Sequence, residues 1–390
     1  MEKAVRSVDD SSRLGERREL PGFLGAFAYG TMVLVLFPLS FLAVEAGGGR
    51  AVGFVLGVML LHVVLDNCFA PIARSAKDTR GIHDLWLKLQ LPCALVLLGL
   101  VVLKSATPAA LARIGLAGIT PYGTWSELAG GIFATAFMYG GNTVVAHEFM
   151  HRRDRAANAL AWVLLTVTGD AQFVIAHVHG HHLNVGTGAD AATARRGESV
   201  YRFFVRSTIG QYAESFALEA QRIRDARRGV RLLKNRVVRG IVASAVLIVL
   251  SGLAFGVRAG VAVFGVMVVA KLLLEAINYI QHYGLVRVHG ERVLPRHSWD
   301  CVGRGAGYIL FGLGLHADHH ANPTKPMWQL APSSGSPLLK HGYMATLIVA
   351  FFPPLWFRYI GTQLREWDDT MASPLERRLL AGSSLQERAA

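Results

Sequence analysis

Charged residues are scarce in this chain. Only 17% of its 390 residues are charged, whereas soluble domains carry about a quarter. The charges are also unevenly spread, so that long apolar stretches hold none. The first of these stretches, Gly22 to Val44, is long enough to cross a ~30 Å hydrocarbon core at about 1.5 Å per residue. This shortage of charge excludes a pair of ordinary soluble domains and predicts an integral membrane protein.

Cysteine is also rare, with only Cys68, Cys93 and Cys301 present and no CxxC pair. The spacing excludes a disulfide framework and a fused rubredoxin or cysteine-ligated iron–sulfur module. A cleavable leader is not predicted either, because the first apolar run is too long and lacks a clear small-residue cleavage site. We therefore expect that run to be a retained first helix.

Acidic residues are outnumbered by basic ones, 27 to 40, which gives a net charge of +13. The basic residues are dense in the first 20 residues, near Arg74 to Arg80, and between Arg152 and Arg239, but sparse at the intervening turns. This asymmetry is the positive-inside pattern of membrane proteins, so nucleic acid is not the expected partner. The N-terminus, 69–85, 147–238 and the C-terminal region are predicted to face the cytoplasm.

The predicted fold is an all-α integral membrane protein with six transmembrane helices. They are placed near 22–45, 51–68, 86–104, 124–146, 239–257 and 259–281. Two further apolar stretches, 157–176 and 343–360, are interrupted by polar or proline residues. We expect them to pack on the bundle or lie in the interface. The predicted domains are a cytoplasmic tail (1–20), a membrane domain (21–365) and a C-terminal tail (366–390).

Nine of the fifteen histidines form four tight groups at the predicted cytoplasmic ends of these helices. The groups contain His147 and His151; His177, His181 and His182; His282; and His316, His319 and His320. Positions i and i+4 share one face of a helix, so paired imidazoles at that spacing reach one metal ion. On this reasoning His177 and His181 share one face, and His182 turns toward a second ion.

Clustered imidazoles suit zinc, iron, copper or nickel, and nine exceed the coordination of one ion. Two ions are therefore the natural count. The HExxH sequence at 147–151 also fits a zinc protease with Glu148 as general base, but that reading leaves seven clustered histidines unexplained. A metal transporter would place its ligands at several depths of the membrane rather than at one.

Five stretches carry a more specific resemblance. They are HEFMHRRD (147–154), HVHGHH (177–182) with DAATARRGES (190–199), LLLEAINYIQHYGL (272–285), HSW (297–299) and LHADHHANPT (315–324). In box spacing and flanking sequence, over roughly residues 20 to 360, the chain resembles the membrane alkane monooxygenase branch of the fatty acid desaturase and hydroxylase superfamily. The branch includes alkane hydroxylase and xylene monooxygenase-like enzymes.

The resemblance implies a non-haem diiron monooxygenase that uses O₂ to hydroxylate an unactivated C–H bond of an alkane, alkyl side chain or fatty chain. It implies that all nine clustered histidines bind two irons, and that a separate rubredoxin or ferredoxin, with its reductase, supplies electrons. A lipophilic substrate would arrive from membrane lipid, and the arginine-rich insert suits docking of a small acidic carrier. Desaturation, acetylenation or decarboxylation of a fatty chain is the alternative outcome.

The chain departs from these relatives at a few positions. Gln281 and Ala176 stand where relatives usually carry Glu, HSWDCV replaces HSWNSN, and the acidic segment after the second span is reduced to Asp66. None of these changes removes a predicted ligand. They leave the identity of the substrate open.

Four other residues are candidates for positions around the ligands. Glu148 and Asp318 lie within the boxes, where a carboxylate orients an imidazole. Glu275 lies one turn from Lys271 inside the sixth span, and either pairs with it or faces the metals. His297 is kept by relatives. The remaining histidines are treated as ordinary residues: His62, His83, His179, His289 and His341.

Overall fold

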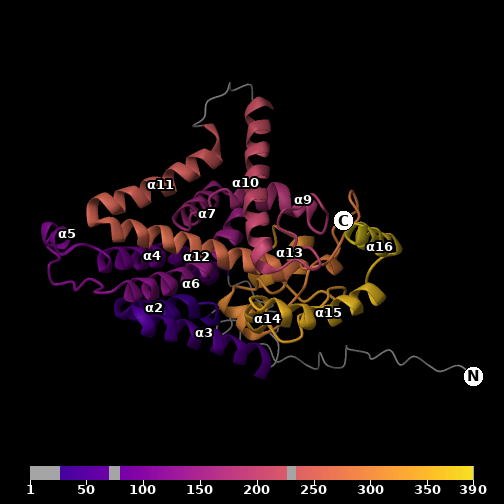
Figure 1. Cartoon of the computed structure of the whole chain (residues 1–390), viewed down its shortest axis with the longest axis horizontal. Helices are drawn as coiled ribbons and strands as arrows, with labels where there is room; N and C mark the ends of the chain where they lie inside the picture. Colours follow the sequence, from indigo (N-terminus) through magenta and orange to yellow (C-terminus); the bar gives the residue numbers. More distant parts are fainter. Residues whose placement is uncertain (1–26, 70–79, 226–233, 390) are drawn as a thin grey trace, which may run out of the picture.

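The computed structural model describes residues 27–69, 80–225 and 234–389. Long helices lie side by side through one half of the molecule, and shorter helices and loops gather at one end of them (Figure 1). Five helices are long and apolar enough to cross a membrane. They are α3 (Gly48–Cys68), α4 (Arg80–Lys104), α6 (Trp125–Met150), α11 (Arg236–Phe255) and α12 (Val257–His282). The prediction of an all-helical, multi-pass membrane protein is confirmed.

The first predicted span, 22–45, falls partly outside the described residues. Its described part consists of the π-helical turn η2 (Met32–Leu36) and helix α2 (Phe37–Ala46). This apolar helical stretch is shorter than the five candidate spans. The sixth crossing therefore stays a prediction.

Tight turns join successive long helices at the end of the bundle where α5 (Pro108–Arg113) lies (Figure 1). Gly47, between α2 and α3, has φ +62°, and Gly256, between α11 and α12, has φ +104°. Residues with a Cβ rarely adopt such angles, so glycine permits both reversals. The amide of Thr107 donates to the Phe255 carbonyl (2.9 Å), which fastens two of these turns together. Helices α3, α6 and α12 consequently all run toward the opposite end.

Helix α6 lies at the centre of the bundle and packs against α2, α3, α4, α7 and α12. It begins with a capping box in which Thr124 and Glu127 exchange hydrogen bonds of 3.0 and 3.2 Å. Near its start Gly130 is so close to the backbone of Gly48 that any side chain would collide. Such small residues allow membrane helices to approach closely. The helix continues four residues past its predicted end, through the HExxH sequence.

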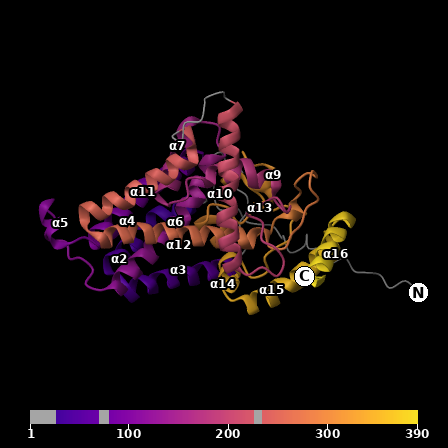
Figure 2. The same ribbon diagram turned by 45° about the horizontal axis from the view of Figure 1, so that its top comes forward.

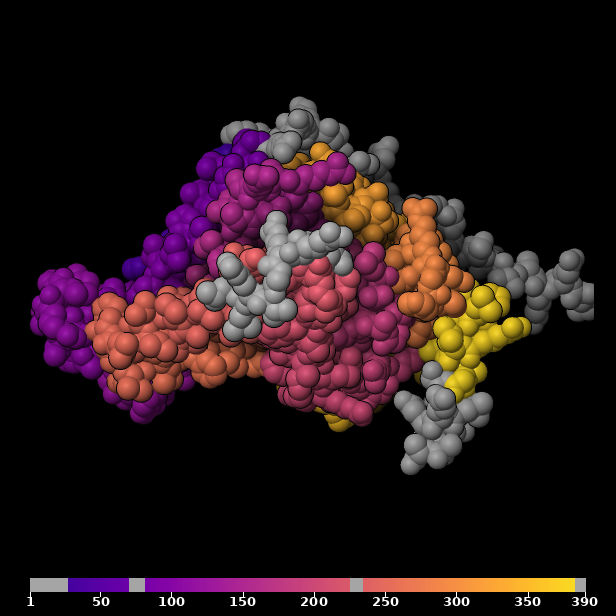
Figure 3. All heavy atoms as spheres, turned by 90° about the horizontal axis from the view of Figure 1, so that it is seen from above, coloured from indigo at the N-terminus to yellow at the C-terminus, as the bar shows by residue number. Residues whose placement is uncertain are grey.

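The region between α6 and α11 lies outside the long bundle. Helix α7 (Arg155–Val167) has 13 residues, about 20 Å, and packs against α6 and α11, as expected for 157–176. It is followed by α8 (Phe173–Ala176), the π-helical turn η3 (His177–His181) and α9 (His182–Asn184). Helix α10 (Val200–Asp225) stands across the bundle (Figure 2) and forms part of the face beside α11 (Figure 3).

The chain after α12 forms short elements at the same end of the bundle. They are η5 (Pro295–His297), η6 (Gly305–Ile309), α13 (His316–Ala321), η7 (Met327–Gln329), α14 (Tyr343–Ala350), α15 (Pro353–Thr370) and α16 (Pro374–Ala389). The stretch 343–360 is broken between α14 and α15, where Pro353 starts the new helix.

Residues 366–390, expected to form a C-terminal tail, do not form a free one in their described part. Helix α15 continues to Thr370, α16 follows, and Glu376 of α16 is completely buried. Its carboxylate binds Arg296 (3.1 Å), and Asp368 makes a second ion pair with Arg196 (2.6 Å). Composition alone hides this contact, because nothing in the sequence of α16 marks Glu376 as a buried residue.

Candidate metal centre

The nine clustered histidines meet at the end of the bundle where α6 and α12 terminate. His147 and His282 lie in the last turns of these two helices, and His151 caps the end of α6. The other six come from the short elements η3, α9 and α13. Their ring nitrogens form two groups, each with all ligand atoms within 4.8 Å of one another. The first group contains His147, His151, His177, His182 and His319. The second contains His181, His282, His316 and His320.

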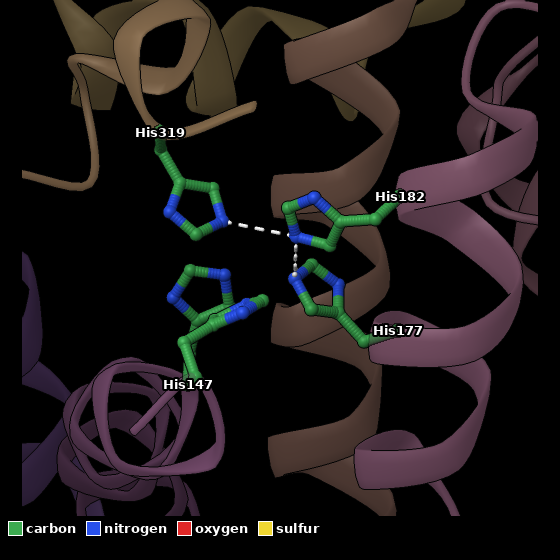
Figure 4. A group of neighbouring side chains, drawn as sticks. His147, His177, His182 and His319 are labelled. Carbon is green, nitrogen blue, oxygen red and sulfur yellow. Dashed lines mark hydrogen bonds between the residues drawn. The ribbon is translucent and has the colours of Figure 1, made fainter. Parts of the chain in front are cut away.

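In the first group the imidazole nitrogens point toward a common centre (Figure 4). Nε2 of His182 lies 3.0 Å from Nε2 of His177 and 3.1 Å from Nε2 of His319. Two nitrogens that bind one ion at about 2.1 Å with a right angle between them lie about 3.0 Å apart, so this spacing fits a shared cation. Nε2 of His147 and His151 is buried without a hydrogen-bond partner. A bound cation would satisfy these lone pairs.

The second group has the same geometry. Nε2 of His316 lies 3.0 Å from Nε2 of His282 and 3.1 Å from Nε2 of His320. The ring of His181 lies 4.8 Å from that of His282 and 5.0 Å from that of His320, measured between centroids. Two neighbouring groups of five and four imidazoles, each of which could hold a cation, thus lie at one end of the bundle.

The partition of the second histidine box differs from the expectation. The structure places His177 with His182 in one group and His181 in the other, so the predicted pairing of His177 with His181 was wrong. The cause is the π-helical turn η3, in which the amide of His182 donates to the carbonyl of His177, five residues back. Such a turn brings residues i and i+5 onto one side, and π-turns are frequent at functional sites. The predicted α-helical periodicity does not apply there.

Burial favours the neutral form of several of these imidazoles. Desolvation, and then the neighbouring imidazoles, hold the pKa of His177, His319 and His320 well below the ordinary value. A neutral imidazole has a lone pair for a metal, and a protonated one has none. These three imidazoles therefore present lone pairs rather than positive charges. His179 lies outside both groups and is exposed to solvent, as predicted for a residue off the ligand face.

Three polar groups each contact the outer ring nitrogen, Nδ1, of one clustered histidine. They are the carboxylate of Asp190, the carbonyl of His297 and the side-chain amide of Gln281. Asp190 Oδ2 accepts a hydrogen bond from Nδ1 of His181 (2.8 Å), which directs Nε2 of that ring toward the centre. The carboxylate also accepts from the Thr193 hydroxyl (2.6 Å) and from the Ala192 amide (2.9 Å). Burial opposes its ionisation, but His181 and these donors outweigh burial and lower the pKa of Asp190.

Asp190 was not singled out among the candidate residues. The sequence did point to this residue, because Asp190 is the first residue of the DAATARRGES stretch and follows His181 by nine positions. A contact of that kind depends on the path of the intervening loop, which spacing alone does not reveal.

Two further histidines of the second group, His282 on α12 and His316 on α13, also have a polar partner at Nδ1. Nδ1 of His282 donates to the backbone carbonyl of His297 (3.1 Å). The side-chain amide of Gln281 lies 3.2 Å from Nδ1 of His316. Asp300 accepts from the Ala317 amide (2.8 Å) at the start of α13, and burial raises the pKa of its carboxyl to about 7. Two of the positions that depart from the relatives, 281 and 300, therefore contact the ligand-bearing segments.

The other residues predicted around the ligands make their hydrogen bonds elsewhere. Glu148 binds Arg152 (3.1 Å) and the Met327 amide (3.1 Å). Asp318 binds Lys325 (2.5 Å) and the Ala331 amide (2.8 Å). These contacts tie the histidine boxes to neighbouring loops.

Glu275 and His297 also have partners outside the two groups. Glu275 pairs with Lys271 (2.7 Å), which also contacts Asp170 (2.9 Å). The ring of His297 donates to Glu376 (2.8 Å), so this residue supports His282 through its carbonyl alone.

A small cavity opens onto both groups. It is lined by His147 and His177 of the first group and His316 of the second, together with the mostly apolar residues Gly140, Thr143, Val144, Phe173, Leu274, Ile277, Asn278, Gln281 and Leu313. A reacting carbon held there would lie beside both cation sites. Walls of this kind exclude water and bind apolar molecules.

Comparison with known proteins gives a family match and several relatives. A family model described as fatty acid desaturase matches residues 123–334. The hydroxylase component of xylene/toluene monooxygenase from Pseudomonas putida is 32% identical, over 83% of this chain and 84% of that protein. An alkane 1-monooxygenase from Pseudomonas aeruginosa is 36% identical over 57% of this chain, and one from Ectopseudomonas oleovorans is 31% identical over 61%. This chain spans 60% of the length of each of these two relatives.

Proposed function

The chain belongs to the fatty acid desaturase family, and from that premise we propose that it is a membrane oxygenase that hydroxylates an unactivated C–H bond of an apolar substrate. In the reaction one atom of O₂ enters the C–H bond to give an alcohol. The other leaves as water, and two electrons and two protons are consumed. The relatives named as xylene/toluene and alkane monooxygenases support this outcome.

The observation that carries the proposal is the convergence of nine buried imidazoles into two groups, with facing Nε2 atoms 3.0 to 3.1 Å apart. We assign the first group, His147, His151, His177, His182 and His319, to one iron. The second group, His181, His282, His316 and His320, is assigned to the other. Two bound irons would supply the redox chemistry that activates O₂ for attack on a C–H bond.

The contributions of the protein are positioning and exclusion of water. Asp190, Gln281 and the carbonyl of His297 orient one imidazole each, and this support fixes the direction of the ligand lone pairs. The apolar cavity beside His147 and His316 holds the substrate so that one C–H bond faces the two sites. Placement of this kind accounts for much of the rate of an enzymatic reaction.

We assign the histidine end of the bundle to the cytoplasmic side of the cell membrane. Helices α3, α6 and α12 end there, and the basic residues that directly follow α6 begin at that end, which fits the positive-inside rule. An apolar substrate would reach the cavity from lipid. Electrons would come from a separate rubredoxin or ferredoxin, because the three cysteines cannot form an internal iron–sulfur site.

A desaturase outcome is the second candidate, since the family name covers enzymes that remove a second hydrogen. The zinc protease reading is less compatible with the site. Its general base would be Glu148, whose carboxylate is bound by Arg152 and the Met327 amide. Moreover, His147 and His151 share their centre with three further imidazoles.

The test is a reaction of the purified, iron-loaded protein with ¹⁸O₂, a ferredoxin or rubredoxin with its reductase, and a panel of alkanes, alkylbenzenes and fatty chains. We expect an alcohol that carries one ¹⁸O atom. An alkene without ¹⁸O as the product would show that the enzyme desaturates its substrate rather than hydroxylating it. Absence of any oxidised product from an enzyme containing its full iron complement would contradict both.

A further inference from the structure

A second, larger cavity lies behind the first. It is lined by residues of η2, α3, α6, α12, η6 and α14, and by Leu310. Gly140 and Ile277 line both cavities, so the two meet between α6 and α12. A Cβ at Gly140 would have only Leu273 within 4.0 Å, so there is free space at this shared wall. A substrate that reacts beside the histidines and is long enough to pass Gly140 and Ile277 would extend into the second cavity.

The walls of the second cavity are apolar except at two residues. Twelve of its fourteen lining residues are glycine, leucine, isoleucine, methionine or phenylalanine, and the other two are His62 and Tyr343. Both are buried, with exposed fractions of 2% and 1%. Nε2 of His62 and the hydroxyl of Tyr343 have no hydrogen-bond partner. Buried polar atoms are nearly always paired in folded proteins, so an unpaired couple in one cavity points to a missing ligand.

The hydrogen-bonding character of this pair follows from its surroundings. Nδ1 of His62 lies 3.1 Å from the Val58 carbonyl, which only accepts, so Nδ1 carries the proton and Nε2 is a free acceptor. Burial raises the pKa of the Tyr343 hydroxyl, which therefore keeps its proton and is a donor. The pair offers one acceptor and one donor.

Both residues are held in place by α3. His62 is fixed by the Val58 carbonyl one turn earlier, and Asp66, one turn later, accepts a hydrogen bond from the Tyr343 amide (3.0 Å). The two polar atoms are therefore preorganised rather than carried on a loop. In a pocket that is otherwise apolar, a few fixed polar groups determine which end of a ligand enters.

We propose that the second cavity binds a hydroxyl group at the end of the substrate remote from the reacting C–H bond, so that the preferred substrate is a long-chain alcohol rather than a plain hydrocarbon. This inference rests on the proposed hydroxylase function. A hydroxyl can donate to Nε2 of His62 and can accept from Tyr343, which are the two roles that these atoms leave open. A carboxylate is disfavoured, because the lining residues include no Lys or Arg. The product is a diol with its two hydroxyl groups at opposite ends.

The test uses a competition between 1-octanol and n-nonane, which have the same number of heavy atoms. The iron-loaded enzyme is placed in lipid nanodiscs with ferredoxin or rubredoxin, its reductase and O₂, and the products are quantified. We expect 1-octanol to be preferred and to give mainly 1,8-octanediol. Tyr343→Phe and His62→Leu should each lower kcat/KM for 1-octanol about fivefold relative to n-nonane, the effect of losing one hydrogen bond. Iron content should be unchanged.

Tyr359→Phe is the matched control. Its hydroxyl bonds to Thr346 (3.0 Å), and Tyr359 is not among the residues that line the cavity, so this variant should keep the preference of the parent. Equal use of the two probes by the parent enzyme, or a preference that both variants retain, would overturn the inference while leaving the hydroxylase function intact. Failure to oxidise either probe would count against the proposed function and the inference together.

Discussion

The carboxylate of Asp190 lies behind the ring of His181, and this contact shows how single residues set the metal site. His181 is the only ligand whose far nitrogen bonds to a carboxylate in the described structure. Removing the negative charge weakens the hold on the proton of Nδ1 and lowers the basicity of Nε2. Outer-shell partners of this kind typically contribute about 10- to 100-fold in metal affinity or activity.

We therefore expect Asp190→Asn to lower iron affinity or turnover by about 10- to 100-fold while the protein stays folded. Iron content after dialysis against a chelator, together with kcat, measures the effect. Asp369→Asn is the control, because Asp369 is exposed on α15. Parent-like iron retention and kcat in Asp190→Asn would show that the contact is dispensable.

The sequence predicts which histidines come together better than how they divide into two groups. Histidine spacing on helices brings His147 next to His151 and His316 next to His320, because α-helical periodicity holds at both places. The π-turn at His177–His181 changes the partition of the second box, and no local residue pattern marks such a turn in advance. The contacts of Asp190 and Gln281 with the histidines depend on how loops and helices pack, and this packing cannot be read from a single sequence.

Among the elements, α10 and α11 are joined by one buried carboxylate. Glu219 of α10 is completely buried and binds Arg222 (2.8 Å) and Arg236 (2.7 Å), and it accepts from the Arg236 amide (2.8 Å). Burial opposes ionisation, but the two arginines and the amide outweigh it and lower the pKa of Glu219 to about 2. The unfolded value is about 4.3.

The sign of the resulting pH dependence follows from this depression. Glu219 contributes its full stabilisation above the unfolded pKa and loses it as the pH falls toward 2. We expect Glu219→Gln to destabilise the protein by about 1–2 kcal/mol at pH 7, a value reduced because solvent screens the partly exposed arginines. Thermal unfolding in detergent, followed by circular dichroism between pH 7 and 3, should show the difference from the parent shrinking on acidification.

Glu366→Gln provides the comparison, since Glu366 and its partner Lys340 are 60% and 54% exposed. Such a pair contributes little, so this variant should unfold like the parent at every pH. A Glu219→Gln penalty that does not change with pH would mean that packing, rather than charge, joins the two helices.

At the scale of the whole molecule, the alternating direction of the long helices places every ligand at one end. Composition predicted the apolar helices, because a long charge-free apolar run is typical of a membrane-spanning helix. It did not predict that α16 returns to this end, where Glu376 binds His297, whose carbonyl supports His282. Helix α16 is thus connected to the second histidine group through the contact between Glu376 and His297.

The central claim is that the chain holds two irons, one in each histidine group. The most direct measurement is iron per chain, with Mössbauer spectra of an iron-57 sample, for the parent, His319→Ala and His181→Ala. The account predicts about two coupled high-spin irons in the parent, and lowered iron content with loss of the coupled signal in each variant. One zinc and no iron in the parent after iron-replete growth, or an unchanged coupled pair in either variant, would contradict it.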